Sequence, residues 1–138
     1  MKKFLILLLI PVLYTGLQSC KKQETEDNSD NNQPDPLEII TKDYWLRVKV
    51  ETYNSSGTLT HVNNPYDKWI FALSKDYYVF DTSGQLDRNG KWELLDDGNI
   101  IDISDRVFNV DTLSEDLFII SEQYYNYGDK QIHYYVRN

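Results

Sequence analysis

The stretch KWELLDDGNIIDI, residues 91–103, decides the fold expected for this chain. Trp92 and Leu94 occupy alternate positions before an Asp-Gly turn, and Ile101 and Ile103 do the same after it. An Asp-Gly pair next to alternating apolar residues is a strong signal for a β-hairpin. The stretch therefore predicts two antiparallel strands that place these four apolar side chains on one face.

The alternation continues on both sides of this hairpin. Upstream, residues 44–53 place Leu46, Val48 and Val50 on one face, and residues 58–62 are expected to return as the partner strand. Short apolar runs separated by turn residues supply further inward candidates: Trp69 and Phe71, Tyr78 and Phe80, Phe108 and Val110, Leu117 and Ile119, and Ile132, Tyr134 and Val136. No segment has a helical period longer than about one turn. We therefore expect about eight or nine short strands.

These strands define the predicted fold class, which is all-β. Regularly spaced hairpins form either an up-and-down barrel or a sandwich. A barrel is favoured because a meander that closes on itself leaves no free edge strands. We predict a small antiparallel up-and-down β-barrel of about eight short strands over residues 37–138. Trp45 has the opposite parity from Leu46, so it either caps the barrel end across a bulge or lies outside.

The length and charge of the chain limit the number of domains and the kinds of partner that it can have. A chain of 138 residues fits one domain. Its 22 acidic and 14 basic residues give a net charge of −8, the wrong sign for binding a polyphosphate, so nucleic acid is not an expected partner. One Cys and two distant His residues offer neither a disulfide framework nor a metal centre, and no cofactor is expected.

The amino terminus predicts export. Met1-Lys2-Lys3 is followed by an apolar run from Phe4 to Leu13, as in a secretory signal peptide, which we place at residues 1–19. Leu17-Gln18-Ser19-Cys20 resembles a bacterial lipobox, with an aliphatic residue three positions before the Cys and a small residue next to it. The resemblance implies that Cys20 is lipidated and anchors the protein in a membrane. The alternative is an ordinary signal peptide followed by an incidental Cys.

A flexible tether is expected between the anchor and the barrel. Residues 20–36 contain no large apolar side chain after Cys20, so they cannot bury enough surface to fold. Removing residues 1–19 removes two Lys and no acids, which leaves 12 basic and 22 acidic residues and a net charge of −10. The acidic residues soon after Cys20 either resemble an export signal to the cell surface or are solvated tether. We expect a cell-envelope protein anchored to the outer membrane, on a face left undecided.

The strands also carry a family resemblance. The features that carry it are Trp45 near the start of the first strand, Gly90-Lys91-Trp92 in the middle, and the series at residues 101–103, 108–113 and 117–120. Together they resemble the small lipocalin-like domain lipoproteins of Gram-negative bacteria. The resemblance covers residues 37–138, with Asp43 where the family often has a Gly two residues before the Trp. It implies a lipocalin-like β-barrel.

The barrel interior holds the candidate ligand-binding residues. An eight-stranded barrel is just wide enough to be filled by its own side chains or to hold one small ligand. The residues expected to line an apolar cavity are Leu46, Val48, Phe71, Phe80, Trp92, Ile103 and Phe108. The alternative is that such bulky side chains are plain core.

A second candidate site is a Tyr-rich surface. Tyr124, Tyr125 and Tyr127 concentrate Tyr where some of it must face solvent, and Tyr supplies rigid amphipathic contact area for binding. The alternative is cross-strand aromatic pairing with Tyr134 and Tyr135 that only stabilises the sheet.

Catalysis is not expected. His61 and His133 stand alone in the sequence, and each is interpreted as a strand residue and not as a general base or a metal ligand. The chain has none of the common nucleophile, zinc-protease or phosphate-loop motifs. Two functions remain. One is a lipid-anchored binding module for a small apolar ligand, and the other is a cavity-less accessory lipoprotein that binds an envelope protein through its Tyr-rich surface.

Overall fold

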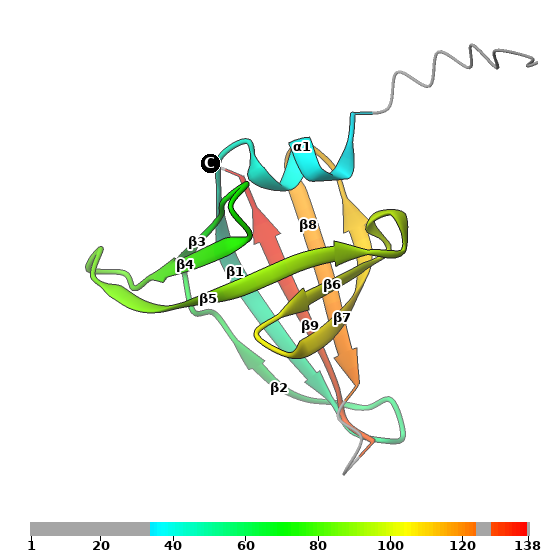
Figure 1. Cartoon of the computed structure of the whole chain (residues 1–138). Coiled ribbons are helices and arrows are strands. Elements are labelled where there is room, and N and C mark those ends of the chain that lie inside the picture. Colours follow the sequence, from blue (N-terminus) through cyan, green and yellow to red (C-terminus); the bar gives the residue numbers. More distant parts are fainter. Residues whose placement is uncertain (1–33, 124–127, 138) are drawn as a thin grey trace, which may run out of the picture. The chain divides into compact units, whose positions relative to one another are not determined.

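The computed structural model describes residues 34–123 and 128–137. Within these residues the chain forms nine strands, one short α-helix and one 3₁₀ turn (Figure 1). The helix is α1 (Pro36–Thr41), and the 3₁₀ turn is η1 (Asp96–Gly98). The strands are β1 (Tyr44–Tyr53), β2 (Leu59–Asn63), β3 (Asp67–Phe71), β4 (Asp76–Phe80), β5 (Leu86–Leu95), β6 (Ile100–Ile103), β7 (Arg106–Leu113), β8 (Leu117–Gln123) and β9 (Lys130–Val136).

Eight of the nine described strands close into an antiparallel barrel. β1 pairs with β3, each later strand pairs with the one before it, and β9 pairs back with β1 (Figure 1). β2 is the extra strand: it pairs with residues 50–53 of β1, past the residues 44–47 that pair with β3. The predicted all-β class and the closed up-and-down barrel are confirmed.

The hairpin predicted at residues 91–103 is formed by β5 and β6. Trp92 lies opposite Ile103, and Leu94 lies opposite Ile101, so all four side chains share the inner face of the sheet as predicted. The turn η1 takes left-handed backbone angles at all three of its residues. Asp and Gly tolerate this conformation better than most residues, which explains why this turn closes here.

A short helix that the alternation pattern did not predict covers one end of the barrel (Figure 1). Asp35 caps α1 by accepting a hydrogen bond from a backbone amide of the first turn at 2.9 Å, and Pro36 occupies the first helical position. Ile39 and Ile40 are buried in the core. The domain boundary expected after residue 36 therefore falls inside this capped helix.

β1 contains a bulge that reverses its parity. Its pairing with β9 shifts after Arg47, so Trp45 and Arg47 point inward before the shift and Val50 points inward after it. Trp45 is fully buried, so of the two positions considered it takes the one inside the end of the barrel, across a bulge, and not the one outside. Leu46 and Val48 are only half-buried and lie outside the core cluster, so their predicted place in the barrel interior is wrong.

The inward parity also differs from the prediction in β4, β8 and β9. In β4, Tyr77 and Val79 are buried whereas Phe80 is half-buried, so the predicted interior place of Phe80 is wrong as well. In β8 and β9 the inner face is displaced by one residue, and the buried side chains include Phe118, Ile120, His133 and Tyr135. Apolar residues occupy both parities of these strands, so alternation alone does not identify the inner face.

Packed aromatic rings fill the barrel next to α1. We call Trp45, Phe71, Trp92 and Phe118 the aromatic core. The ring centroids of Trp45 and Phe118 lie 5.5 Å apart, those of Phe71 and Trp92 lie 5.3 Å apart, and Phe71 meets Phe118 edge-on at 6.1 Å. Burying one such side chain contributes roughly 1.5–3 kcal/mol, so this cluster is a major source of stability.

Arg137 closes the same end of the barrel. Its guanidinium lies 4.4 Å from the centre of the Trp45 ring and donates a hydrogen bond to the Ile39 carbonyl of α1 at 2.5 Å. The Trp45 indole donates to the Ile40 carbonyl at 3.1 Å. The helix is thus fixed to the first and last parts of the barrel by polar bonds as well as by apolar packing.

Candidate functional site

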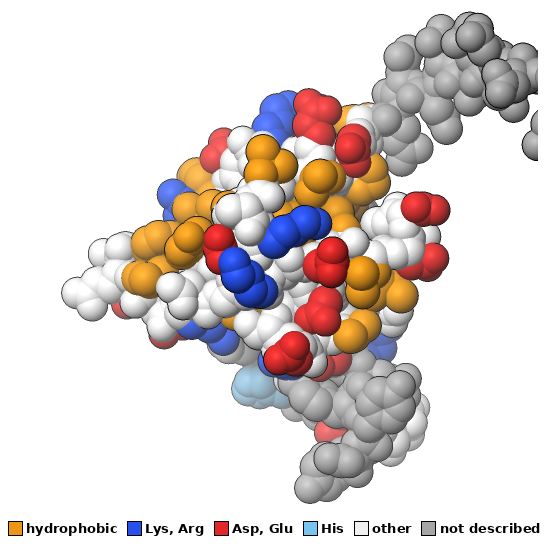
Figure 2. All heavy atoms as spheres, in the orientation of Figure 1, with side chains coloured by type: hydrophobic (Ala, Val, Ile, Leu, Met, Phe, Trp, Pro, Cys, Tyr) orange, Lys and Arg blue, Asp and Glu red, His pale blue; other side chains and the backbone are white. Residues whose placement is uncertain are grey.

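The outer surface carries mixed charges and open grooves. On the face shown in Figure 2, acidic, basic and hydrophobic side chains are intermixed, so no large area of that face has one sign of charge. Within the described part of the chain, no three His, Cys, Asp or Glu residues gather into a group able to hold a metal ion. None of the described helices is long and apolar enough to cross a membrane.

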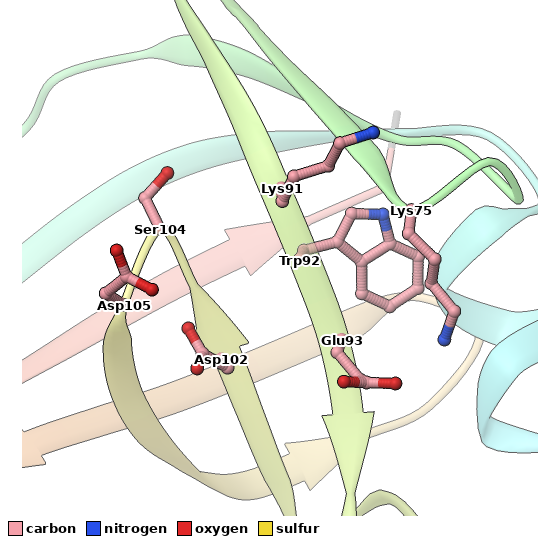
Figure 3. Close-up of a pocket in the computed structure, with 7 residues that line it drawn as sticks. All are labelled: Lys75, Lys91, Trp92, Glu93, Asp102, Ser104 and Asp105. Carbon is pink, nitrogen blue, oxygen red and sulfur yellow. The ribbon is translucent and has the colours of Figure 1, made fainter.

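One of these grooves, drawn in Figure 3, lies over β5 and β6 and has a volume of about 460 Å³. Asp102 and Asp105 lie on the β6 side of β5, whereas Lys75 lies on the other side (Figure 3). Lys91 points away from the two aspartates and donates a hydrogen bond to Asp76 at 2.6 Å. The charged groups of this groove therefore do not converge on a common point.

A cavity of about 170 Å³ inside the barrel gathers polar groups far more closely. Its walls come from every barrel strand except β8, and from the turn between β6 and β7, which lies at the end of the barrel away from α1 (Figure 1). The lining residues are Arg47, Trp69, Tyr77, Arg88, Ile103, Ser104, Arg106, Phe108, His133 and Tyr135. We call this space the arginine cavity.

The residues predicted to bind a ligand divide between the arginine cavity and the aromatic core. Ile103 and Phe108 are buried and line the cavity. Phe71 and Trp92 are buried as predicted, but they belong to the aromatic core and do not line the cavity. Cys20, Tyr124, Tyr125 and Tyr127 lie outside the described residues, so the predictions for them stay predictions.

One arginine of the cavity wall belongs to a buried ion pair. Arg47 and Asp67 face each other across the β1–β3 pairing. The guanidinium donates two hydrogen bonds to the carboxylate, at 2.9 and 2.5 Å, and the two side chains are only 12% and 11% exposed. A two-pronged pair of this kind is strong and geometrically specific, so it fixes the orientation of the Arg47 guanidinium.

The other two arginines of the cavity are held differently. Arg106 donates hydrogen bonds through two of its nitrogens to Glu122. Arg88, whose side chain is 48% exposed, lies 3.7 Å from the Asp67 carboxylate and 3.4 Å from that of Asp87. Arg88 therefore reaches the cavity from the solvent side with longer and more adaptable ion pairs.

Aromatic faces support these arginines. The Arg47 and Arg88 guanidinium groups lie 5.2 and 5.4 Å from the centre of the Trp69 ring, and Tyr77 stacks on Trp69 at 5.5 Å. Arg106 lies 5.3 Å from the ring centre of Phe108. Such cation–π contacts are favourable where solvent is partly excluded, so the rings stabilise positive charge at the cavity wall.

His133 lies in the same cavity and is neutral near pH 7. Its side chain is buried, with 6% of the residue exposed, and its Nδ1 atom lies 3.5 Å from Nη1 of Arg47. Burial, followed by the positive charges of Arg47, Arg106 and Arg88, lowers the pKa of His133 to about 3. His61, by contrast, is exposed on β2.

Two buried polar atoms of cavity-lining residues have no hydrogen-bond partner within the described residues. They are Nε2 of His133 and the indole Nε1 of Trp69. The indole N–H groups of the other two Trp residues are bonded, Trp45 to the Ile40 carbonyl and Trp92 to the Ala72 carbonyl, each at 3.1 Å. Buried polar groups are nearly always paired, and two of the three exceptions among the described residues lie in this cavity, so it is a candidate site for a ligand; the third is Nε of Arg137.

Gly90 makes room for two lining residues of the cavity to meet. A Cβ atom at this position would lie 2.3 Å from the Ser104 hydroxyl and 2.7 Å from the Tyr77 ring. Because Gly90 has no side chain, the hydroxyls of Tyr77 and Ser104 meet at 3.0 Å. This close approach fixes two further lining residues.

Comparison with known proteins adds no assignment. No protein-family model matches the chain, and no curated protein matches it. The interpretation of the arginine cavity therefore rests on its own geometry, which combines three cationic side chains, aromatic walls and two unpaired polar atoms.

Proposed function

We propose that this chain is a cell-envelope lipoprotein whose lipocalin-like barrel binds one small ligand inside the arginine cavity. The observation that carries the proposal is the cavity itself, about 170 Å³ in the interior of a closed barrel. A space of about 150 Å³ is enough for one benzene-sized molecule. The ligand is therefore a small molecule, or the end of a larger one that leaves the barrel beside Ser104 and Arg88.

The chemistry of the walls supports binding and not catalysis. A general base works best when its pKa lies near the working pH, and the pKa of His133, lowered to about 3, is far below it. Trp69, Tyr77, Phe108 and Tyr135 instead supply broad apolar faces for the body of a ligand. These faces fit the small, largely apolar ligand expected from the sequence.

Membrane attachment belongs to the same proposal. It rests on the lipobox-like Leu17-Gln18-Ser19-Cys20 and on the low-hydropathy tether that follows it. When the chain is expressed in a Gram-negative host, we expect mass spectrometry to find a mature protein that begins at Cys20 and carries acyl chains. The Cys20→Ala variant should lose these acyl chains and leave the membrane fraction. An unmodified Cys20 in the mature protein would contradict the anchor.

Native mass spectrometry tests ligand binding directly. The mature, tag-free chain would be extracted from the envelope of its own host in a mild detergent and measured before and after extraction with organic solvent. We expect a discrete additional mass that the solvent removes, because a ligand inside the barrel is protected during purification. A protein that carries its anchor but no further mass would contradict the proposal.

A second function is favoured by β2. All five of its residues are exposed, and within the described residues it pairs only with β1, so its outer edge is free. Leu59 and Val62 are 46% and 45% exposed. A free edge with apolar side chains is suited to adding a strand from an envelope protein. If native mass spectrometry finds the protein without a ligand, this accessory, protein-binding role is favoured instead.

A further inference from the structure

We infer that the arginine cavity recognises a carboxylate, so that the ligand is a small planar organic acid whose anionic group meets the arginines while its body packs on Trp69. The inference rests on the proposed ligand-binding function and narrows it to one chemical class. It differs from the apolar ligand expected from the sequence in one testable respect, which is the negative charge.

The choice of cation supports a carboxylate. Three of the four arginines of the chain line the cavity, none of the six lysines in the described residues does, and the lining includes no Asp or Glu. A guanidinium offers a rigid planar fork that matches the two oxygens of a carboxylate, and it also stacks on aromatic rings. Lysine lacks the planar fork, and the described lysines all lie outside the cavity lining.

Arg88 is the cavity arginine that is placed to receive an anion. Asp67 is bonded by Arg47, and Glu122 is bonded by Arg106. Arg88 shares Asp67 at 3.7 Å and otherwise meets only the exposed Asp87 at 3.4 Å, both longer than a hydrogen bond. Arg47 and Arg106 are therefore hydrogen-bonded to carboxylates, whereas Arg88 has only these two longer ion pairs within the described part of the chain. A bound carboxylate would give Arg88 a close partner.

The two unpaired polar atoms of the cavity also support a ligand with acceptor oxygens. The Trp69 indole N–H is a donor only, and the neutral His133 ring can present its own N–H at Nε2. Each residue is more than nine-tenths buried, with 5% and 6% exposed. An acceptor oxygen on the ligand would satisfy one or both atoms, whereas a purely apolar molecule would leave both unpaired.

Benzoate and benzamide are matched probes for this inference, because they share shape and size but differ in charge. The measurement uses the ¹⁵N-labelled mature chain in non-ionic detergent micelles and follows its indole N–H signals. The chain has three Trp residues, and the Trp69→Phe variant identifies the signal of Trp69. We expect benzoate to move the Trp69 signal in a saturable way, to leave the bonded indoles of Trp45 and Trp92 in place, and to bind at least about ten times tighter than benzamide.

A charge-matched pair of variants separates the cavity from general electrostatics. Arg88→Gln and Lys42→Gln each remove one positive charge from a side chain about half exposed, but Lys42 pairs with Glu115 and does not line the cavity. Both residues are exposed enough that the fold should survive. We expect Arg88→Gln to weaken benzoate binding about tenfold or more, and Lys42→Gln to leave it within about twofold.

Three other results would contradict the inference. Equal binding of benzoate and benzamide would overturn the carboxylate inference and leave the ligand-binding function standing. Inorganic phosphate that binds as tightly as benzoate would also overturn it, since the aromatic walls would then contribute nothing. If neither organic probe binds, native mass spectrometry distinguishes two cases. A protein that carries a neutral ligand would overturn the carboxylate inference alone. A protein without any ligand would overturn both the inference and the proposed ligand-binding function.

Discussion

The aromatic core and the arginine cavity lie in the same barrel and follow opposite rules. In the aromatic core, Trp45 and Trp92 have their polar atoms bonded to backbone carbonyls, and the rest of the cluster is apolar. The cavity wall instead includes the arginine of a buried ion pair, a buried His133 and two unpaired polar atoms. Burial of rings stabilises a fold, whereas buried charge rarely does. The first region therefore holds the barrel together, and the second, which adds little stability, is where we propose that the ligand binds.

The largest expected effect comes from the aromatic core. Phe118→Ala removes a fully buried ring that contacts Trp45 and Phe71, so it should lower the free energy of unfolding by about 3–5 kcal/mol. Urea denaturation followed by far-UV circular dichroism measures this change. Phe118→Leu, which keeps most of the volume, is the control and should cost less than half as much. A loss below about 1 kcal/mol would mean that this cluster does not dominate stability.

Breaking the ion pair of the cavity should cost nearly as much, but for another reason. Arg47→Met leaves the Asp67 carboxylate buried without its main partner, and such a change typically costs about 3 kcal/mol. Replacing both residues, as Arg47→Met with Asp67→Leu, should recover most of the loss because no isolated charge remains. A double variant as unstable as the single one would show that the pair itself stabilises the fold. The same urea titration measures all three proteins.

The pH dependence of the free energy of unfolding should show that His133 is buried in its neutral form. Its pKa is lowered in the folded protein to about 3, so the unfolded chain binds the extra proton first as the pH falls below about 6.5. Stability is therefore greatest above pH 6.5 and declines between pH 6.5 and 3, by at most about 1.4 kcal/mol per pH unit from this group.

Two histidine variants isolate that contribution. His133→Asn should flatten the decline between pH 6 and 4, whereas His61→Asn, on the exposed β2, should decline as the natural protein does. Carboxylates such as Asp76, whose pKa is lowered by its bond to Lys91, add the same slope to every variant. If the two histidine variants have the same slope, His133 is not buried in its neutral form.

The smallest effect on stability is expected at the solvent side of the cavity. Arg88→Gln removes a half-exposed side chain whose ion pairs are long, so the free energy of unfolding should change by less than about 0.5 kcal/mol. Because the same variant should lose carboxylate binding, it separates function from stability more cleanly than Arg47 does. A thermal melt with and without benzoate checks both quantities. A destabilisation above about 1 kcal/mol would mean that Arg88 contributes to the stability of the fold and is not only a ligand-binding residue.

Sequence reasoning succeeded where one parity of a strand is apolar and the other is polar. The β5–β6 hairpin follows this pattern, and its turn, pairing and inner face were all predicted. It failed in β8 and β9, where apolar residues occupy both parities. It failed most in β1, because a bulge shifts the alternation and because Arg47 points inward while Leu46 does not. The usual assumption that charged residues face solvent thus assigns the wrong face of a strand to the barrel interior where the interior holds a polar cavity.

The arginine cavity itself had no linear signal. Arg47, Arg88 and Arg106 are about forty and twenty residues apart and come from three different strands, and His133 comes from a fourth. Only closure of the barrel brings them together. The single clue in the sequence was compositional, because three of four arginines lie within strands that otherwise carry the core. Lipidation, in contrast, is predicted from four adjacent residues and needs no fold at all.

The pairing of β1 with β9 has a consequence for how the domain forms. Leu46 lies opposite Val136 and Tyr53 opposite Lys130, so the seam joins the first barrel strand to the last one. Such distant pairings make folding slow, in milliseconds to seconds for comparable β-proteins. The barrel also cannot close until its final strand has been synthesised. A chain of this topology cannot complete its barrel until nearly all of it has emerged from the ribosome, which would suit the export that the sequence predicts.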